Sequence, residues 1–333
     1  MTVLDINELA LDAGIGRSSD VPKSEGKSYL RTIQGNDGSD AQGLISANLA
    51  PTLKLNRPLN ATNIDYEKCA QELIDHGYSL LPIPEYIQRD FWEAVELYPS
   101  ISKQNKDEFS YPDRTDGFMP FGMEYASTSG KVDLCERFCY RVKYRSDHRH
   151  HPFASHQFYR HVVDFESGLS AISERILESI QRKFSILEPI ETRSSSYLQF
   201  CAYSKEYRND DREYLQDRHE DGHLITFVKA TRDGLVIFPN GERQRVNLAD
   251  DEIIVFTGSL LTELSDNAIP FMEHAVLNGT VQVERSSLVY FVIPELKRKY
   301  TSFIERRDIH LEKIANENHK SFGNIPFTMM AAT

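Results

Sequence analysis

The chain has 333 residues, enough for a sizeable core and about two domains by length, although one large β domain with helical flanks also fits. Its 38 basic and 50 acidic residues give a net charge of −12, and no run of Lys or Arg alternates with aromatic residues. Because a phosphate-tracking surface needs such a basic stretch, we expect no nucleic-acid partner.

The N-terminal stretch MTVLDINELALDAG carries acids and no base, which is unlike the start of a secretory signal. No long uncharged apolar stretch follows it, so we expect a cytoplasmic protein with no membrane partner. The cysteines are too few for a disulfide scaffold and lack the short paired spacings of zinc sites. We therefore expect buried or free thiols at Cys69, Cys135, Cys139 and Cys201.

Residues 1–60 are rich in Ser, Gly, Asp and Asn and have no sustained periodicity, which predicts a partly ordered N-terminal arm. A helix is expected to begin at Asp65, a good N-cap, because apolar residues then recur with helical spacing as far as Gly77. A short strand in YSLLPI and a second helix that Pro84 helps to start follow. This order predicts a helical region with early strands over residues 61–190.

A longer helix is expected at about residues 157–184, where apolar residues keep to one helical face and could support a sheet. After Pro189 the pattern changes to short strand-like runs, and Asn240-Gly241 indicates a hairpin because both residues tolerate positive φ. These runs lie at about residues 195–203, 223–228, 234–238, 243–248, 252–257, 271–277 and 280–293. They predict a sandwich or double-sheet jelly roll over residues 191–300, with a C-terminal helix or tail over 301–333.

A candidate metal site lies within these runs. His219 and Asp221 are two residues apart, so on an extended backbone their side chains point to one face. His274 comes from a later strand-like run, and two imidazoles with one carboxylate suit iron(II) with open coordination positions. A lone histidine is more often an ordinary half-buried side chain, but that interpretation has to explain the whole set at once.

Neighbouring residues suggest a pocket for a keto acid. Arg285 and Ser287 share one face of a strand, and a guanidinium fork beside a hydroxyl suits a carboxylate. Tyr203 is either a second donor to that carboxylate or a packed core residue. His223 continues the two-residue register, and it could line the pocket, hydrogen-bond near the metal, replace a ligand or serve only the fold.

With these residues, the chain resembles the iron(II)- and 2-oxoglutarate-dependent oxygenases of the isopenicillin N synthase-like group over residues 62–296. The motifs that carry the resemblance are AQELIDHGYSLLPI, DGFMPFGMEYASTSGKVDLCERF, HEDGHLITFVKATRDGLVIF, DEIIVFTGSLLTELSDNAIPFMEHAV and ERSSLVYFVIP. The resemblance implies a mainly β fold with flanking helices and a double-stranded β-helix core, which is a jelly-roll, cupin-like architecture.

The resemblance also implies the chemistry. His219, Asp221 and His274 would be the catalytic iron ligands, and Arg285, Ser287 and Tyr203 would bind 2-oxoglutarate. Dioxygen would then oxidise a small-molecule substrate by hydroxylation, desaturation or ring closure, with succinate and carbon dioxide as co-products. Asp221 favours oxygen chemistry, because family members that halogenate usually lack this carboxylate.

Other functions stay open at this point. An oxidase like isopenicillin N synthase would use no 2-oxoglutarate, a jelly roll without turnover would only bind, and a zinc hydrolase could use the same three ligands. The substrate and the oligomeric state are not predicted.

Two further groups have expected roles outside the site. His148, His150 and His151 form a local cluster that we interpret as a solvated connection able to bind metal only adventitiously. Asp133, Glu136 and Arg137 lie in the segment that the resemblance associates with the substrate, but exposed charge is the expectation for them.

Overall fold

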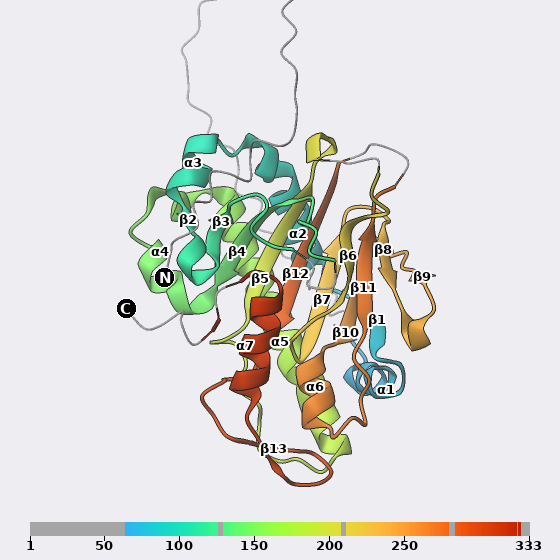
Figure 1. Cartoon of the computed structure of the whole chain (residues 1–333). Coiled ribbons are helices and arrows are strands. Elements are labelled where there is room, and N and C mark those ends of the chain that lie inside the picture. The colour runs from blue at the N-terminus through green and yellow to red at the C-terminus, as the bar shows by residue number, and fades with distance from the viewer. Residues whose placement is uncertain (1–63, 126–128, 208–210, 280–283, 325, 328–333) are drawn as a thin grey trace, which may run out of the picture. The chain divides into compact units, whose positions relative to one another are not determined.

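The computed structural model describes residues 64–125, 129–207, 211–279, 284–324 and 326–327, all within one compact unit, Arg57–Thr333 (Figure 1). The arm predicted over residues 1–60 lies outside the described residues, as do the first four residues of the predicted run 280–293. In the part of the chain that is described, no helix is both long and apolar enough to cross a membrane.

The strands are β1 (Tyr78–Pro82), β2 (Ser110–Tyr111), β3 (Asp116–Met119), β4 (Glu136–Arg141), β5 (Tyr197–Tyr203), β6 (Tyr214–Glu220), β7 (Ile225–Ala230), β8 (Leu235–Ile237), β9 (Gln244–Arg245), β10 (Glu252–Thr257), β11 (Glu273–Leu277), β12 (Arg285–Val292), β13 (Tyr300–Thr301) and β14 (Asp308–Ile309). One sheet has the order β1-β10-β7-β12-β5-β4-β3-β2, a second has the order β6-β11-β8-β9, and β13 pairs with β14. The pairings are antiparallel.

From β5 to β12 the chain passes from one large sheet to the other at each step except between β8 and β9. That exception is the predicted hairpin, in which Asn240 and Gly241 both have positive φ, 53° and 83°. Two facing sheets joined in this way form a jelly roll, so the predicted double-stranded β-helix core is confirmed.

The helices are α1 (Tyr66–His76), α2 (Glu85–Leu97), α3 (Lys103–Glu108), α4 (Arg145–His148), α5 (Gln157–Lys183), α6 (Ser259–Leu264) and α7 (Leu311–Ser321). Short 3₁₀ turns lie at Tyr98–Ser100, Pro112–Arg114, Val142–Tyr144, Pro152–Ser155, Lys205–Tyr207 and Pro239–Gly241. The predicted limits of the first helix are confirmed. The Asp65 side chain accepts a hydrogen bond from the Lys68 amide, and Gly77 ends the helix in the left-handed conformation.

The helices α1, α2 and α5 pack against one face of the eight-stranded sheet. Figure 1 shows α5 behind this sheet and α7, in red, in front of it. The apolar side of α5 joins α1, α2 and the sheet in one core that includes Phe91, Phe165 and Phe200. The strands β5, β7 and β10 are therefore buried on both faces, since their other face looks into the jelly roll.

The early strands and β6 differ from expectation in detail. The strands β2, β3 and β4 extend the eight-stranded sheet beyond β5 and so join the jelly roll. β6 was not among the predicted strands, although it carries His219. Its sequence, YLQDRHE, is mostly polar and only partly buried, so it lacks the apolar alternation by which the other strands are recognised.

The interpretation of His148 as part of a solvated loop is wrong. Its side chain is buried, with Nε2 2.7 Å from Asp116 Oδ2 and Nδ1 2.8 Å from the Tyr159 hydroxyl. The imidazole thus joins β3 to α5, while His150 remains exposed. A buried histidine with two polar partners is a structural residue here, and single-sequence patterns do not separate it from a surface histidine.

Candidate metal centre and adjoining pockets

The structure brings His219, Asp221 and His274 together inside the jelly roll. One potential ligand atom from each residue lies within 4.8 Å of the others, and all three side chains are buried. Asp221 Oδ1 is 3.7 Å from His219 Nε2 and 3.9 Å from His274 Nε2. Among the described residues, this is the one group of three or more such side chains close enough to hold a metal.

Strand pairing explains how two distant histidines meet. His219 on β6 and His274 on β11 are direct partners in the antiparallel register, and their ring centres are 4.3 Å apart. Side chains of such partners point to the same face of a sheet. His219 and Asp221 come together because they are neighbours in sequence. His274 joins them through the pairing between β6 and β11.

Asp221 lies just beyond the end of β6 rather than within it. The turn that follows is held by the start of α6, where the Ser259 amide donates to the Asp221 carbonyl and the Leu260 amide donates to the His223 carbonyl. Gly258 permits this approach, since a Cβ there would lie 2.4 Å from both carbonyl oxygens. The position of the carboxylate is therefore set by the backbone.

Hydrogen bonding and burial orient the histidines for metal binding. His219 Nδ1 lies 2.7 Å from the Asp217 carbonyl oxygen, so Nδ1–H donates there and Nε2 is the ring atom toward Asp221. Burial, with a further contribution from His219, lowers the pKa of His274 well below its usual value. A neutral imidazole is the form that binds a metal. Two imidazoles and a carboxylate on one side fit iron(II).

His223 is not part of this group. It lies in the turn after β6, where its ring is 5.9 Å from that of Tyr197 and 4.6 Å from that of Phe291. Burial lowers its pKa to about 4, so the side chain is neutral near pH 7. Of the roles considered for it, the structure favours lining a pocket over replacing a ligand.

One cavity extends from the metal centre into the jelly roll. Residues of both sheets line it, among them Tyr203, Arg285 and Ser287 together with all three candidate ligands. Arg285 is 5% exposed, and its Nε, Nη1 and Nη2 atoms are buried without a hydrogen-bond partner among the described residues. A buried guanidinium without an acceptor is costly, so the cavity is suited to a carboxylate.

Tyr203 stands directly opposite Arg285 on β5, and the Arg285 guanidinium carbon is 5.0 Å from the centre of the tyrosine ring. The Tyr203 hydroxyl donates to Gln216 Oε1 at 3.3 Å. Burial raises the pKa of Tyr203 well above its usual value, so the phenol keeps its proton. Tyr203 thus lines the same cavity as Arg285, and its hydroxyl has a protein acceptor.

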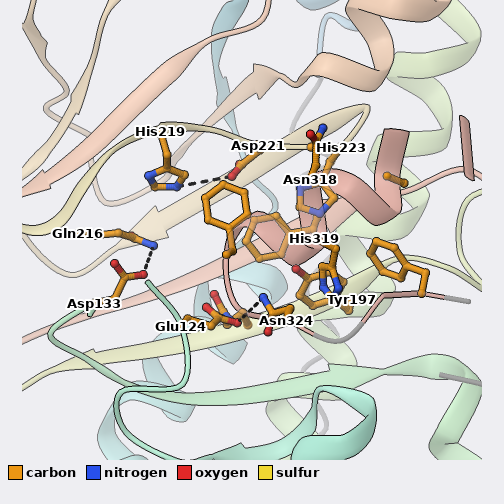
Figure 2. A pocket seen from close by; sticks show the side chains of 16 residues that line it. Glu124, Asp133, Tyr197, Gln216, His219, Asp221, His223, Asn318, His319 and Asn324 are labelled. Atoms are coloured by element: carbon orange, nitrogen blue, oxygen red, sulfur yellow. Dashed lines mark hydrogen bonds and ion pairs between the residues drawn. The ribbon is translucent and has the colours of Figure 1, made fainter. Parts of the chain in front are cut away.

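A second cavity opens from the metal centre toward α7, as Figure 2 shows. His219, Asp221, Gln199, Gln216 and Phe291 border both cavities. The remaining wall comes from the early segment, from β5, from the turn after β6 and from the C-terminal region: Glu124, Asp133, Tyr197, Gly222, His223, Ala315, Asn318, His319, Phe322, Asn324 and Phe327. The sequence indicated little of this wall.

A buried ionic cluster supports the far side of the second cavity. Arg137 is 3% exposed, and its Nε lies 2.7 Å from Glu124 Oε2 while its Nη2 contacts Asp133 Oδ2. Burial raises the pKa of Asp133, an effect that Arg137 beside it opposes. The expectation that Asp133 and Arg137 are exposed is therefore wrong, because both side chains turn inward where the chain enters β4. Glu136 is half-buried and pairs with Lys106.

Among the described residues, the cysteines belong to no group close enough to hold a metal, and none is in a disulfide. Cys69, Cys135, Cys139 and Cys201 are buried and free, which confirms their expected state.

The chain matches no protein-family model and no curated protein sequence. It is similar in structure to a Neurospora crassa protein in complex with α-ketoglutarate and thymine, with 16% identity, a TM-score of 0.60, and coverage of 77% of this chain and 91% of that one. It is also similar to JOX2 in complex with 2-oxoglutarate, iron and JA, with 14% identity, a TM-score of 0.62 and coverage of 79% and 83%.

A third similar structure is the dioxygenase for auxin oxidation of rice, with 12% identity, a TM-score of 0.62, and coverage of 80% of this chain and 92% of that one. At these identities the likeness establishes the fold. The class that it defines is a jelly roll with flanking helices, which this chain shares with these proteins over most of their length.

Proposed function

We propose that the protein is an iron(II)- and 2-oxoglutarate-dependent oxygenase that oxidises a small molecule. The observation that carries this proposal is the Arg285 guanidinium, which is buried and has no hydrogen-bond partner among the described residues. It lines the same cavity as His219, Asp221 and His274. A three-ligand centre alone fits several metals. A centre with an orphaned guanidinium in its cavity favours a co-substrate that binds metal at one end and carries a carboxylate at the other.

In this function His219, Asp221 and His274 hold iron(II), and Arg285 with Ser287 binds the far carboxylate of 2-oxoglutarate. Tyr203 lines the same cavity and donates its hydroxyl hydrogen to Gln216, so its role would be to pack against Arg285 and hold Gln216 in place. Iron(II) held there would activate dioxygen, with two electrons coming from decarboxylation of the keto acid and two from the substrate. For hydroxylation, one oxygen atom enters succinate and the other enters the product alcohol, and carbon dioxide leaves.

The similar structures support the co-substrate. The Neurospora crassa protein and JOX2 are described in complex with α-ketoglutarate or 2-oxoglutarate, and JOX2 also with iron. Their other named ligands, thymine and JA, are small molecules. A small-molecule substrate is consistent with the second cavity of this chain. Desaturation or ring closure would use the same centre, with the second oxygen atom leaving as water.

The test is turnover of 2-oxoglutarate. Protein loaded anaerobically with iron(II) and 2-oxoglutarate is exposed to oxygen, and succinate is measured by mass spectrometry. We expect succinate that depends on iron, oxygen and Asp221, even if it forms slowly without substrate. Wild-type succinate from Asp221→Ala would contradict the assignment.

Three further measurements separate the alternatives: iron binding, 2-oxoglutarate affinity, and activity without oxygen. An oxidase that takes all electrons from its substrate would bind iron without 2-oxoglutarate affinity, and a scaffold without turnover would show no iron-dependent affinity for 2-oxoglutarate in calorimetry. A zinc hydrolase would stay active when oxygen is excluded.

A further inference from the structure

We infer that the second cavity selects a compound that presents an N–H or a non-acidic O–H hydrogen to Asp133, and that it rejects carboxylates and phosphates. The inference rests on the proposed function, because it takes this cavity to be the substrate side of the metal centre. It concerns the chemical class of the substrate and the residue that selects it.

Asp133 has one occupied and one open oxygen. Its Oδ2 atom contacts Arg137 Nη2 and accepts from Gln216 Nε2 at 3.1 Å. Its Oδ1 atom is buried without a hydrogen-bond partner among the described residues, and the residue is 4% exposed. A buried carboxylate oxygen without a donor is costly, so a ligand that supplies an N–H or O–H completes the site.

The neighbouring carboxylate, Glu124, is already satisfied and serves as a support. Gln199 donates to both of its oxygens at 3.1 and 3.2 Å, and Asn324 donates to Oε1 at 3.1 Å. This bond turns the Asn324 amide so that its Oδ1 is the atom without a partner among the described residues. In Figure 2, Asp133 and Asn324 lie on the same side of the pocket, so its open polar atoms on that side are both acceptors.

The charges around the cavity also disfavour an anionic ligand. No Lys or Arg is among the described residues that line this cavity, and the cluster behind it holds two carboxylates, Glu124 and Asp133, against one guanidinium, Arg137. An anionic group beside Asp133 and Glu124 would be repelled by them. Arg141 is the cation on the other side, and its guanidinium carbon lies 4.0 and 5.3 Å from the centres of the Tyr197 and Phe327 rings. An N–H donor, neutral or cationic, is favoured over an O–H donor that is part of an acid.

Four aromatic side chains form part of the rest of the wall. Tyr197, Phe291, Phe322 and Phe327 line the cavity, and the Phe322 ring is 5.4 Å from that of His219. Flat apolar surface packs well against such rings. The class that fits is therefore a small compound with a flat or apolar body and a donor group that is not an acid, such as an amide, a lactam, an amine or an alcohol.

The test uses protein loaded with zinc(II) and 2-oxoglutarate, so that ligands bind without turnover. Calorimetry at millimolar concentrations compares benzamide, benzylamine, N,N-dimethylbenzamide and benzoate, which share one ring but differ in N–H groups and charge. We expect benzamide or benzylamine to bind about tenfold or more tightly than the dimethyl amide or benzoate, the cost of an unmet hydrogen bond to a carboxylate. Tighter benzamide binding indicates a neutral donor, and tighter benzylamine binding indicates an ammonium.

A variant assigns the preference to Asp133. In Asp133→Asn the side-chain oxygen should turn to Arg137 and Gln216, so that an NH₂ group replaces the open acceptor. We expect the N–H preference to disappear while 2-oxoglutarate still binds. Asp75→Asn, which removes an exposed acid on α1, is the matched control and should behave as wild type.

Three results would overturn the inference: benzoate binding as well as benzamide, no difference between benzamide and its dimethyl form, or no binding by either N–H compound. The wild-type series decides the matter even if Asp133→Asn does not fold. Because 2-oxoglutarate affinity is measured first in the same protein, failure of the proposed function appears as loss of that affinity. Failure of the present inference leaves it intact.

Discussion

The two cavities that meet at the metal centre are built differently. The inner cavity, which Arg285 and Ser287 line, lies within the jelly roll. These two residues sit at alternate positions on β12. The outer cavity, which is the second cavity described above, is assembled from segments far apart in the chain, including Glu124, Asp133 and Asn324. In the proposed function, strand geometry thus supplies the cavity for the co-substrate, whereas packing between distant segments supplies the cavity for the substrate.

The largest effect is expected from the metal centre that both cavities share. Asp221→Ala should remove iron binding and reduce succinate formation to the background of the assay, because two imidazoles alone leave the cation without a charged ligand. Iron content by elemental analysis and succinate by mass spectrometry check this. Unchanged iron content would mean that the metal is held elsewhere.

The next largest effect is expected in the inner cavity, from changes to Arg285 that should weaken 2-oxoglutarate binding. Arg285→Gln should weaken 2-oxoglutarate binding by roughly a hundredfold to a thousandfold, since breaking a buried ionic pair costs about 3–5 kcal/mol. Arg285→Lys should not restore it, because a point charge does not replace the planar fork. Calorimetry with 2-oxoglutarate gives the affinity.

Ser287→Ala is the milder companion, with an expected loss of about 1 kcal/mol for one hydroxyl hydrogen bond. Equal losses in Arg285→Gln and Ser287→Ala would contradict the guanidinium's leading role. Benzamide affinity should change little in either variant if the two cavities are distinct.

A third change tests the contact between the jelly roll and α7. A Cβ at Gly222 would lie 2.4 Å from Asn318 Cβ, so Gly222→Ala should push the helix outward and lower the free energy of unfolding by about 1–3 kcal/mol. Benzamide binding should weaken more than 2-oxoglutarate binding. Urea unfolding and calorimetry measure the two.

Gly279→Ala is the control, since a Cβ there meets nothing within 4 Å among the described residues. If Gly222→Ala lost iron in proportion to benzamide, the change would have moved Asp221 and not the helix alone.

The last change concerns the hydrogen bond that joins the C-terminal segment to Glu124, and its effect on stability should be similar to that of Gly222→Ala. Asn324→Ala removes a donor to a buried carboxylate and should cost about 1–3 kcal/mol of stability. It should also weaken benzamide binding severalfold, with 2-oxoglutarate affinity unchanged. Lys320→Ala, at an exposed position on α7, serves as the control. A wild-type affinity for benzamide would show that the segment does not shape the cavity.

How far the site could be predicted follows the same division. Arg285 and Ser287 were recognisable because residues two apart in a strand share a face, which needs only local geometry. The same spacing pointed to His219 and Asp221, although Asp221 lies in the turn after β6. His274 was a candidate from a later strand-like run, and the resemblance then implied its role as an iron ligand. Glu124 and Asn324 gave no local signal, because their roles depend on a hydrogen bond across almost the whole described chain. His148 and Arg137 were misjudged because a polar residue buried by partners looks like a surface residue in sequence.

By itself the amino-acid sequence determined the elements and their kind: a capped helix from Asp65 to Gly77, strands with apolar alternation, and a hairpin at Asn240-Gly241. These follow from backbone preferences and from periodic burial, which act over a few residues. Only the tertiary structure decided that β6 pairs with β11, that Arg285 lacks an acceptor among the described residues, and that Asp133, in the wall of the outer cavity, keeps one oxygen without a donor among those residues. Such facts depend on which distant groups approach, since a buried polar atom is satisfied or left open by neighbours that the local sequence does not contain.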